Sequence, residues 1–280
     1  MPSPAVLWPS LAGIVFLGIG LFTLRRQRSL DSGKRVAFGP ALVASALAAF
    51  GMEHLVDAKT IMQVVPSWMP AQLFVTYAVG IALLAAAVSL AIQRFVRLSA
   101  SLLGVMFLLF VLLIHLPNVV ASPKERMTCV ILFRDLSFGG GAWLLAGGRL
   151  ALIGRFSIAV AAVFFAVVYF LHPDVAPGVP LPKLTPTWVP LRLLWGYLMG
   201  ALLLLTGVAV LVNRRTRLAA IWLAITVTLS VLLLYIPLMA VAPTVEAMNY
   251  IFDTLLFAGT IWLLAETTLD SGPESTAVDS

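Results

Sequence analysis

Long apolar runs separated by short polar connections make up most of this chain. Each run is long enough for a helix to cross about 30 Å of hydrocarbon. The pattern therefore predicts an all-α integral membrane protein with nine transmembrane helices, at about 6–24, 36–56, 70–92, 99–118, 127–147, 153–171, 190–212, 218–238 and 248–265. The polar tail at 267–280 has nothing to bury, so we expect it to be disordered in the cytoplasm.

The third and seventh runs begin with the same pattern, 120 residues apart. Pro-x-Trp-x-Pro at 66–70 recurs at 186–190, and Tyr-x-x-Gly at 77–80 recurs at 197–200. The match continues without a gap to Pro123 and Pro243. Chance similarity between apolar segments would not keep prolines, a tryptophan and arginines in register, so we infer a duplication.

The repeat divides the chain into an N-terminal helix with a basic loop (1–35), a first four-helix unit (36–148), a second four-helix unit (149–266) and the tail (267–280). Each unit has an even number of helices, so both units enter the membrane in the same direction. We therefore expect two tandem four-helix bundles side by side. The packing position of the first helix is left open.

Composition agrees with a membrane protein. Of 280 residues, 61% are hydrophobic and only 11% are charged, which is too few charges to cover a soluble globule. The net charge of +6 does not indicate nucleic-acid binding, because the basic residues form short clusters between apolar runs. Those clusters set topology: Arg25, Arg26 and Arg28 follow the first run and predict an outside N-terminus and a cytoplasmic C-terminus.

Charged residues inside the apolar runs are the candidates for function, because a charge deep in a bilayer is costly and usually faces a cavity or a partner. Arg134 and Asp135 lie about two turns into the fifth run, and Asp253 lies at a similar depth in the ninth. Neighbours on a helix point about 100° apart, so we expect Arg134 to reach Asp253, Glu53 or another helix and not Asp135. A structural clamp and a functional site both remain open.

Other polar residues are expected near the same depth. Glu53 and His54 end the second run, while Tyr77 and Tyr197 are plausible hydrogen-bond partners for the buried carboxylates, although all four also suit an ordinary membrane interface. His115 stands where the second unit has Tyr235, which argues against a duplicated metal site, and no cofactor is predicted. The candidate ligand-binding set is Glu53, His54, Tyr77, Arg134, Asp135, Tyr197 and Asp253.

Each of the two units resembles the DoxX family of small bacterial membrane proteins. The resemblance rests on Gly-x-x-His at 51–54, Pro-x-Trp-x-Pro at 66–70, Tyr-x-x-Gly at 77–80 and Arg-Leu-Ser-Ala at 97–100. This chain has Leu83 and Leu203 at the positions where many proteins that it resembles in this family have an acidic residue. The resemblance implies a multi-pass protein of the bacterial plasma (inner) membrane, with links to quinone or thiol redox systems. The single Cys129 argues against a thiol relay.

Three functions are consistent with these features. The favoured one is a non-enzymatic membrane subunit or binding protein with a polar pocket in the outer leaflet. The alternatives are a proton-coupled transporter that uses Asp135 and Asp253, and a membrane subunit of a quinone-linked oxidoreductase. The expected partners are the lipid bilayer, a hydrophobic small molecule or quinone, and another membrane protein.

Overall fold

The computed structural model describes residues 2–30 and 38–268, and within these residues helices form most of each predicted span. The helices are α1 (Pro4–Leu30), α2 (Gly39–Val56), α3 (Ala58–Ile61), α4 (Gln72–Ala91), α5 (Val96–Phe110), α6 (Leu116–Ala121), α7 (Arg126–Ala146), α8 (Gly148–Leu171), α9 (Arg192–Leu211), α10 (Thr216–Ser230), α11 (Ile236–Val241) and α12 (Val245–Thr267). A 3-10 turn, η1 (Met62–Val64), follows α3, and π-helical turns η2 (Val111–His115) and η3 (Val231–Tyr235) join α5 to α6 and α10 to α11.

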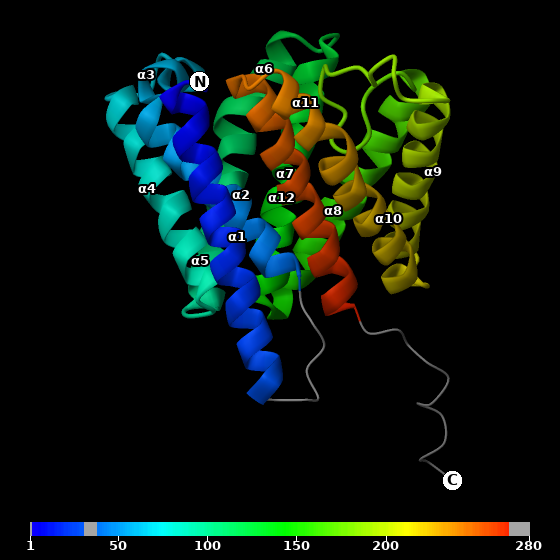
Figure 1. Cartoon of the computed structure of the whole chain (residues 1–280), viewed down its shortest axis with the longest axis horizontal. Helices are drawn as coiled ribbons and strands as arrows, with labels where there is room; N and C mark the ends of the chain where they lie inside the picture. Colours follow the sequence, from blue (N-terminus) through cyan, green and yellow to red (C-terminus); the bar gives the residue numbers. More distant parts are fainter. Residues whose placement is uncertain (1, 31–37, 269–280) are drawn as a thin grey trace.

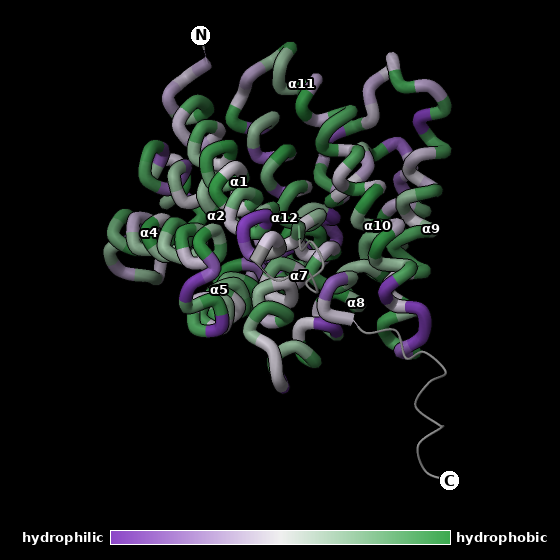
Figure 2. The backbone as a smooth tube through the Cα atoms, turned by 60° about the horizontal axis from the view of Figure 1, so that its bottom comes forward, coloured by the Kyte–Doolittle hydropathy of each residue, from purple (hydrophilic) through white to green (hydrophobic). Residues whose placement is uncertain are grey.

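Nine helical segments of the described chain are long and apolar enough to cross a membrane, which confirms the predicted all-α membrane fold. Two of them are the continuous stretches Val96–Ala121 and Thr216–Val241, each with its π-helical turn inside. Figure 2 shows apolar residues along the helices and hydrophilic ones gathered mainly toward their ends. The residues at 31–37 and 269–280, which include part of the predicted basic loop and nearly all of the predicted tail, lie outside the described residues.

The two predicted units are joined through their inner helices. In the first unit α4 packs on α2 and α5 on α7, and in the second α9 packs on α8 and α10 on α12. The first helix of each unit also packs against the last helix of the other, α2 on α12 and α8 on α7, and α7 contacts α12 directly. The inner helices therefore occupy the centre, with α4 and α5 on one side and α9 and α10 on the other (Figures 1 and 2).

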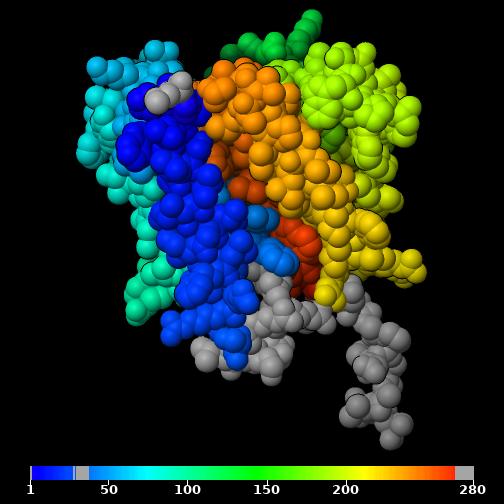
Figure 3. Space-filling view, viewed as in Figure 1, coloured from blue at the N-terminus to red at the C-terminus, as the bar shows by residue number. Residues whose placement is uncertain are grey.

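Helix α1 packs beside the first unit. Its main neighbour is α2, with further contacts to α4 and α12. Figure 3 shows α1 in dark blue on the surface, with parts of α2 and α12 visible beside it. Ser45 Oγ on α2 donates a hydrogen bond to the Gly13 carbonyl at 2.8 Å, which links the two helices across their interface. The position that the sequence left open is thus at the side of one unit.

Backbone features recur at the 120-residue offset of the sequence pattern. Helices α4 and α9 begin 120 residues apart, as do α5 and α10, and η2 and η3. The left-handed residue before each helix also recurs: Ala71 and Leu191 precede α4 and α9, and Phe95 and Arg215 precede α5 and α10. The local turns are therefore built alike, although the evolutionary duplication itself remains an inference from the sequence.

A proline accounts for each π-helical turn. Pro117 and Pro237 lie just after η2 and η3 and have no backbone N–H, so the regular hydrogen-bond ladder cannot continue through them. The helix instead forms one wider, π-helical turn before the proline. Such π-bulges often occur at functional sites. In the first unit this turn ends at His115, whose side chain is buried in the bundle.

The last helix caps the second one. Helix α2 begins without a capping side chain of its own, and its Phe38 and Gly39 N–H groups donate to Glu266 Oε1 at 2.6 and 3.1 Å. Glu266 lies in the last turn of α12, so the cap joins residues 227 or more positions apart. A carboxylate at a helix N-terminus also interacts favourably with the helix dipole.

Substituting Glu266 by alanine is therefore expected to lower the free energy of unfolding by about 1–2 kcal/mol, as the loss of an N-cap does. Glu266→Gln keeps one oxygen acceptor and should cost less. Thermal unfolding of the purified protein in a neutral detergent measures both. An alanine variant as stable as the parent would show that the contact between the α12 and α2 ends contributes nothing.

Candidate functional site

A cavity of about 500 Å³ lies between the helices of the first unit and α12. Its walls come from α2, α4, α5, η2, α7 and α12, and the connection through α3 and η1 covers it with Ile61, Val64, Val65 and Met69. The volume is in the range of small-molecule sites, roughly 300–1,000 Å³. Helix α12 belongs to the second unit, so neither unit alone forms this cavity.

A chain of hydrogen-bonded ionisable side chains crosses one wall of the cavity. His115 Nε2 lies 2.9 Å from Asp135 Oδ2, Arg134 Nε donates to Asp135 Oδ1 at 2.9 Å, and Arg134 Nη1 donates to Asp253 Oδ2 at 3.1 Å. The two aspartates are almost fully buried, whereas 21% of the Arg134 side chain is exposed. The Arg134 guanidinium also lies over the Phe138 ring, 5.8 Å from its centroid. The network ties α7 to η2 and α12.

A second polar group faces the first from α2. Glu53 is 6% exposed, and its Oε1 accepts a hydrogen bond from Asn249 Nδ2 at 3.0 Å. Asn249 and Asp253 are four residues apart on α12 and so share one face of the helix. Asn249 Oδ1 is buried and has no hydrogen-bond partner within the described residues. An unpaired buried carbonyl oxygen costs free energy unless something else donates to it.

Five of the seven predicted site residues line the cavity, namely Glu53, His54, Arg134, Asp135 and Asp253. Arg134 reaches Asp253 as expected, but it also binds Asp135, which the expected 100° separation had argued against. The guanidinium is forked, so Nε can turn to the adjacent carboxylate while Nη1 extends to the neighbouring helix.

The two tyrosines do not join the network. Tyr77 and Tyr197 are 40% and 47% exposed and lie outside the set of residues that line the cavity. The inward position on α4 is the neighbouring Thr76, which is 1% exposed, and the expected partner of Asp135 is supplied by His115 instead. A membrane helix is apolar on most of its faces, so depth alone did not tell which face Tyr77 occupies.

Sequence reasoning also missed Asn249 and left His115 out of the site. The signal for His115 was present, because a histidine inside an apolar run before a proline is unusual. Asn249 stands in the second turn of α12, close to the helix end, where a polar residue attracts no notice. Its relation to the site depends on the packing of α12 against α2, which links residues 196 positions apart.

At the place in the second unit that corresponds to this cavity, a loop of the chain itself is packed into the interior. The loop at 172–185, which we call the inserted loop, joins α8 to the second Pro-x-Trp-x-Pro pattern, and its tip from 175 to 181 is buried. Tyr169 Oη donates to the carbonyls of Ala176 and Gly178, at 2.7 and 3.2 Å. Gly178 has φ +129°, a conformation that favours glycine.

The neighbours of the inserted loop correspond to residues that line the first cavity. Gly196 lies directly against Pro173 and corresponds to Thr76 at the 120-residue offset. In the first unit Gly80 lies close to His54, and in the second unit Gly200 lies close to Tyr169. Tyr169 therefore occupies the position that corresponds to His54. These relations place the inserted loop where the first unit has its cavity.

Helices α7 and α12 correspond at an offset of 119 residues. Trp143 and Trp262 match at this offset, as do Gly140, which packs on α8, and Gly259, which packs on α2. Arg134 then corresponds to Asp253, and Asp135 to Thr254. The two members of the central ion pair are therefore equivalent positions of the two units, and both point to the first unit's cavity.

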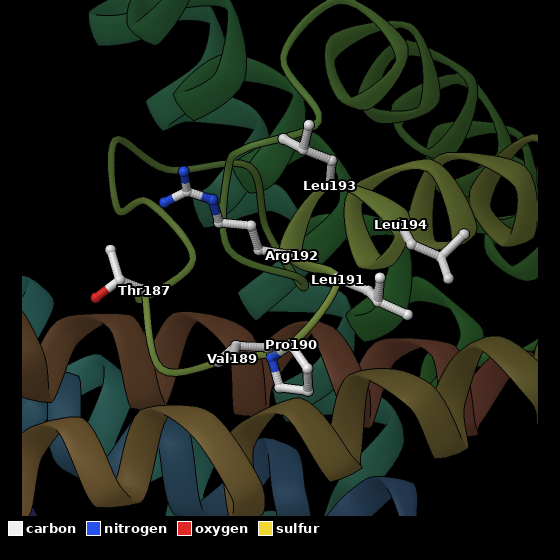
Figure 4. A pocket seen from close by; sticks show the side chains of 7 residues that line it. All are labelled: Thr187, Val189, Pro190, Leu191, Arg192, Leu193 and Leu194. Carbon is white, nitrogen blue, oxygen red and sulfur yellow. The ribbon is translucent and has the colours of Figure 1, made fainter.

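A shallower hollow lies on the surface of the second unit. It is lined by Thr187, Val189, Pro190, Leu191, Arg192, Leu193 and Leu194 (Figure 4). All of these side chains come from one short turn of chain, and Leu191 is 74% exposed. This surface hollow lacks the buried polar groups of the first cavity, so we consider the latter the candidate site.

No group of three His, Cys, Asp or Glu side chains that could hold a metal ion occurs within 2–30 and 38–268. Comparison with protein families gives one match, to a domain of unknown function (DUF8561), over residues 43–130. The matched stretch runs from α2 to the start of α7 and includes Glu53, His54 and His115. The chain has no significant match among curated proteins or among solved structures.

Proposed function

We propose that this chain is a membrane protein that binds an amphiphilic small molecule in the cavity of its first unit. The observation that carries the proposal is the open space of about 500 Å³ in the first unit, at the place where the second unit has its buried inserted loop. Apolar walls with a few buried polar groups at one side are typical of ligand sites. The chain supplies binding and orientation here, as a subunit or carrier and not as an enzyme.

The DoxX-like sequence pattern supports placing the protein in a bacterial plasma membrane. Its topology follows from charge: Arg25, Arg94, Arg149 and Arg214 lie at or beside the helix ends opposite α3, which the positive-inside rule assigns to the cytoplasm. The N-terminus is then outside, the C-terminus is cytoplasmic, and the cavity lies under the outer face. A hydrophobic molecule such as a quinone could enter from the outer leaflet, and a membrane protein partner could receive it.

A proton-coupled transporter is the second candidate. It is favoured by the buried His115, Asp135 and Asp253, which are the residue types that carry protons in membrane transporters, whereas Arg134 keeps its proton and holds the two carboxylates together. The transporter interpretation requires the bound molecule to cross the membrane. Uptake into proteoliposomes with an imposed proton gradient tests it directly, and uptake that is independent of the gradient would contradict it.

Blocking the cavity tests the binding function. Leu109 lines the cavity and Leu229 is its counterpart in the second unit, and both are 46% exposed. We expect Leu109→Trp to abolish the thermal stabilisation that a bound amphiphile gives, while Leu229→Trp leaves it intact. The measurement is the shift in unfolding temperature across a panel of quinones, fatty alcohols and alkylamines. Equal effects of the two variants would contradict the assignment of the cavity as the binding site.

A further inference from the structure

The polar groups of the first cavity are unequal in charge. Three carboxylates, Glu53, Asp135 and Asp253, line it together with one guanidinium, that of Arg134. When all three carboxylates are ionised and the histidines are neutral, negative charges exceed positive charges by two. In a low-dielectric cavity such an excess favours a cation strongly over an anion.

The pairing within the network shows where the excess lies. Asp135 uses both oxygens, one toward Arg134 and one toward His115. Asp253 Oδ1 and Glu53 Oε2, in contrast, accept no hydrogen bond from the described part of the chain, since the bonds to Arg134 and Asn249 go to their other oxygens. The unfilled acceptors therefore gather between α2 and α12.

Two neutral acceptors complete this group. Asn249 Nδ2 donates to the Glu53 carboxylate, which in its ionised form can only accept, and this leaves Oδ1 as the buried oxygen without a partner. His54 Nδ1 lies 2.8 Å from the Phe50 carbonyl, which also can only accept, so Nδ1 carries the proton and Nε2 of the neutral ring is an acceptor. This side of the cavity is thus rich in acceptors and short of donors.

The remaining walls suit an apolar body. Four phenylalanines line the cavity, at 50, 107, 110 and 138, together with leucines and valines. Aromatic faces also attract organic cations by the cation–π interaction. The Arg134 guanidinium already occupies the face of Phe138, which shows that this wall accepts a positive group.

We propose that the cavity binds an organic cation, a protonated amine that donates hydrogen bonds to Glu53 and Asp253 while its apolar body fills the phenylalanine-lined space. This inference rests on the proposed binding function and specifies its ligand. The ammonium group carries three hydrogen-bond donors, which this side of the cavity lacks, and a positive charge that offsets part of the excess negative charge.

Three probes with the same apolar body and different charge test the proposal: phenylbutylamine, phenylbutanol and phenylbutyrate. Calorimetric titration of the full chain in a neutral detergent gives the three dissociation constants. We expect the amine to bind at least about tenfold more tightly than the alcohol, as a charge-assisted hydrogen bond allows, and the acid to bind most weakly. An alcohol that binds as tightly as the amine, or an amine that does not bind, overturns the proposal.

Glu53→Gln removes the charge and keeps the shape and the acceptor for Asn249. It should weaken amine binding about tenfold and leave alcohol binding unchanged. Asn249→Ser provides a second variant if Glu53→Gln does not fold, and the exposed Glu125→Gln is the matched control. If Glu53→Gln folds and leaves the ratio of amine to alcohol affinities unchanged, the cation is not recognised here.

The outcomes separate this inference from the binding function itself. Alcohol and amine binding of equal strength that is lost in Leu109→Trp would keep the cavity as a binding site and remove the cation preference. Failure of every probe and of the wider amphiphile panel, with Leu109→Trp equal to Leu229→Trp, would remove both. Tighter binding of the amine that is lost in Glu53→Gln supports both.

Discussion

Replacing Arg134 by glutamine is expected to lower the free energy of unfolding by about 3–5 kcal/mol, the cost typical of removing one partner from a buried ion pair. The guanidinium pairs with Asp135 and Asp253, which are 4% and 5% exposed, so its loss leaves two buried carboxylates without a cationic partner. Unfolding of the purified protein in mixed micelles with increasing SDS, followed by tryptophan fluorescence, measures the change.

Two further variants show whether charge is the cause. Arg97 is exposed at the opposite end of the helices, and Arg97→Gln should change stability by no more than about 0.5 kcal/mol. Asp253→Asn alone should be destabilising, but Asp253→Asn combined with Arg134→Gln should recover part of the loss, because two amides can pair without charge. An Arg134→Gln protein as stable as the parent would show that the ion pairs are not formed in the folded protein.

Gly196→Ala is expected to push the inserted loop out of the second unit. An added Cβ at this position would fall on the Pro173 carbonyl, which is backbone and cannot swing aside as a flexible side chain can. Overpacking of this kind costs about 1–3 kcal/mol. Trypsin cleavage after Lys183, within the inserted loop, follows the population of the opened loop. Its rate should therefore rise about tenfold for each 1.4 kcal/mol by which the substitution destabilises the buried loop.

The matched control is Gly18→Ala. Gly18 lies within α1, and a Cβ there would meet no heavy atom within 4 Å. Alanine is the better helix former, so this variant should be as stable as the parent or slightly more stable. If Lys183 is cleaved at the parental rate in Gly196→Ala, the loop does not depend on the close approach to α9.

The membrane fold was predictable because the bilayer requires long apolar helices, and the sequence shows them directly. The predicted ends agree with the structure within a few residues for most spans, and the basic turns lie where the pattern placed them. The buried charges were also predictable, since Arg134, Asp135 and Asp253 interrupt otherwise apolar runs. The pairing of Arg134 on α7 with Asp253 on α12 was predictable because the two residues lie at a similar depth in the membrane.

The inserted loop could not be predicted. Its prolines and Gly178 indicate a turn at the surface, where backbone carbonyls are hydrated. Burial of this loop depends on Tyr169, whose hydroxyl satisfies two of its carbonyls, and on Gly196, which leaves room for Pro173. Each of these residues has an ordinary role in isolation. Only their arrangement in space makes the two units different inside.

Arg134 and Asp253 hold equivalent positions of the two units and bind each other. In a symmetric dimer of one such unit, the same residue would occupy both positions, and two arginines or two aspartates would repel each other in the membrane interior. Joining the units in one polypeptide allows the two positions to differ in sign. The ion pair at the centre of this bundle can therefore form between two covalently linked units, but it cannot form in a homodimer of either unit.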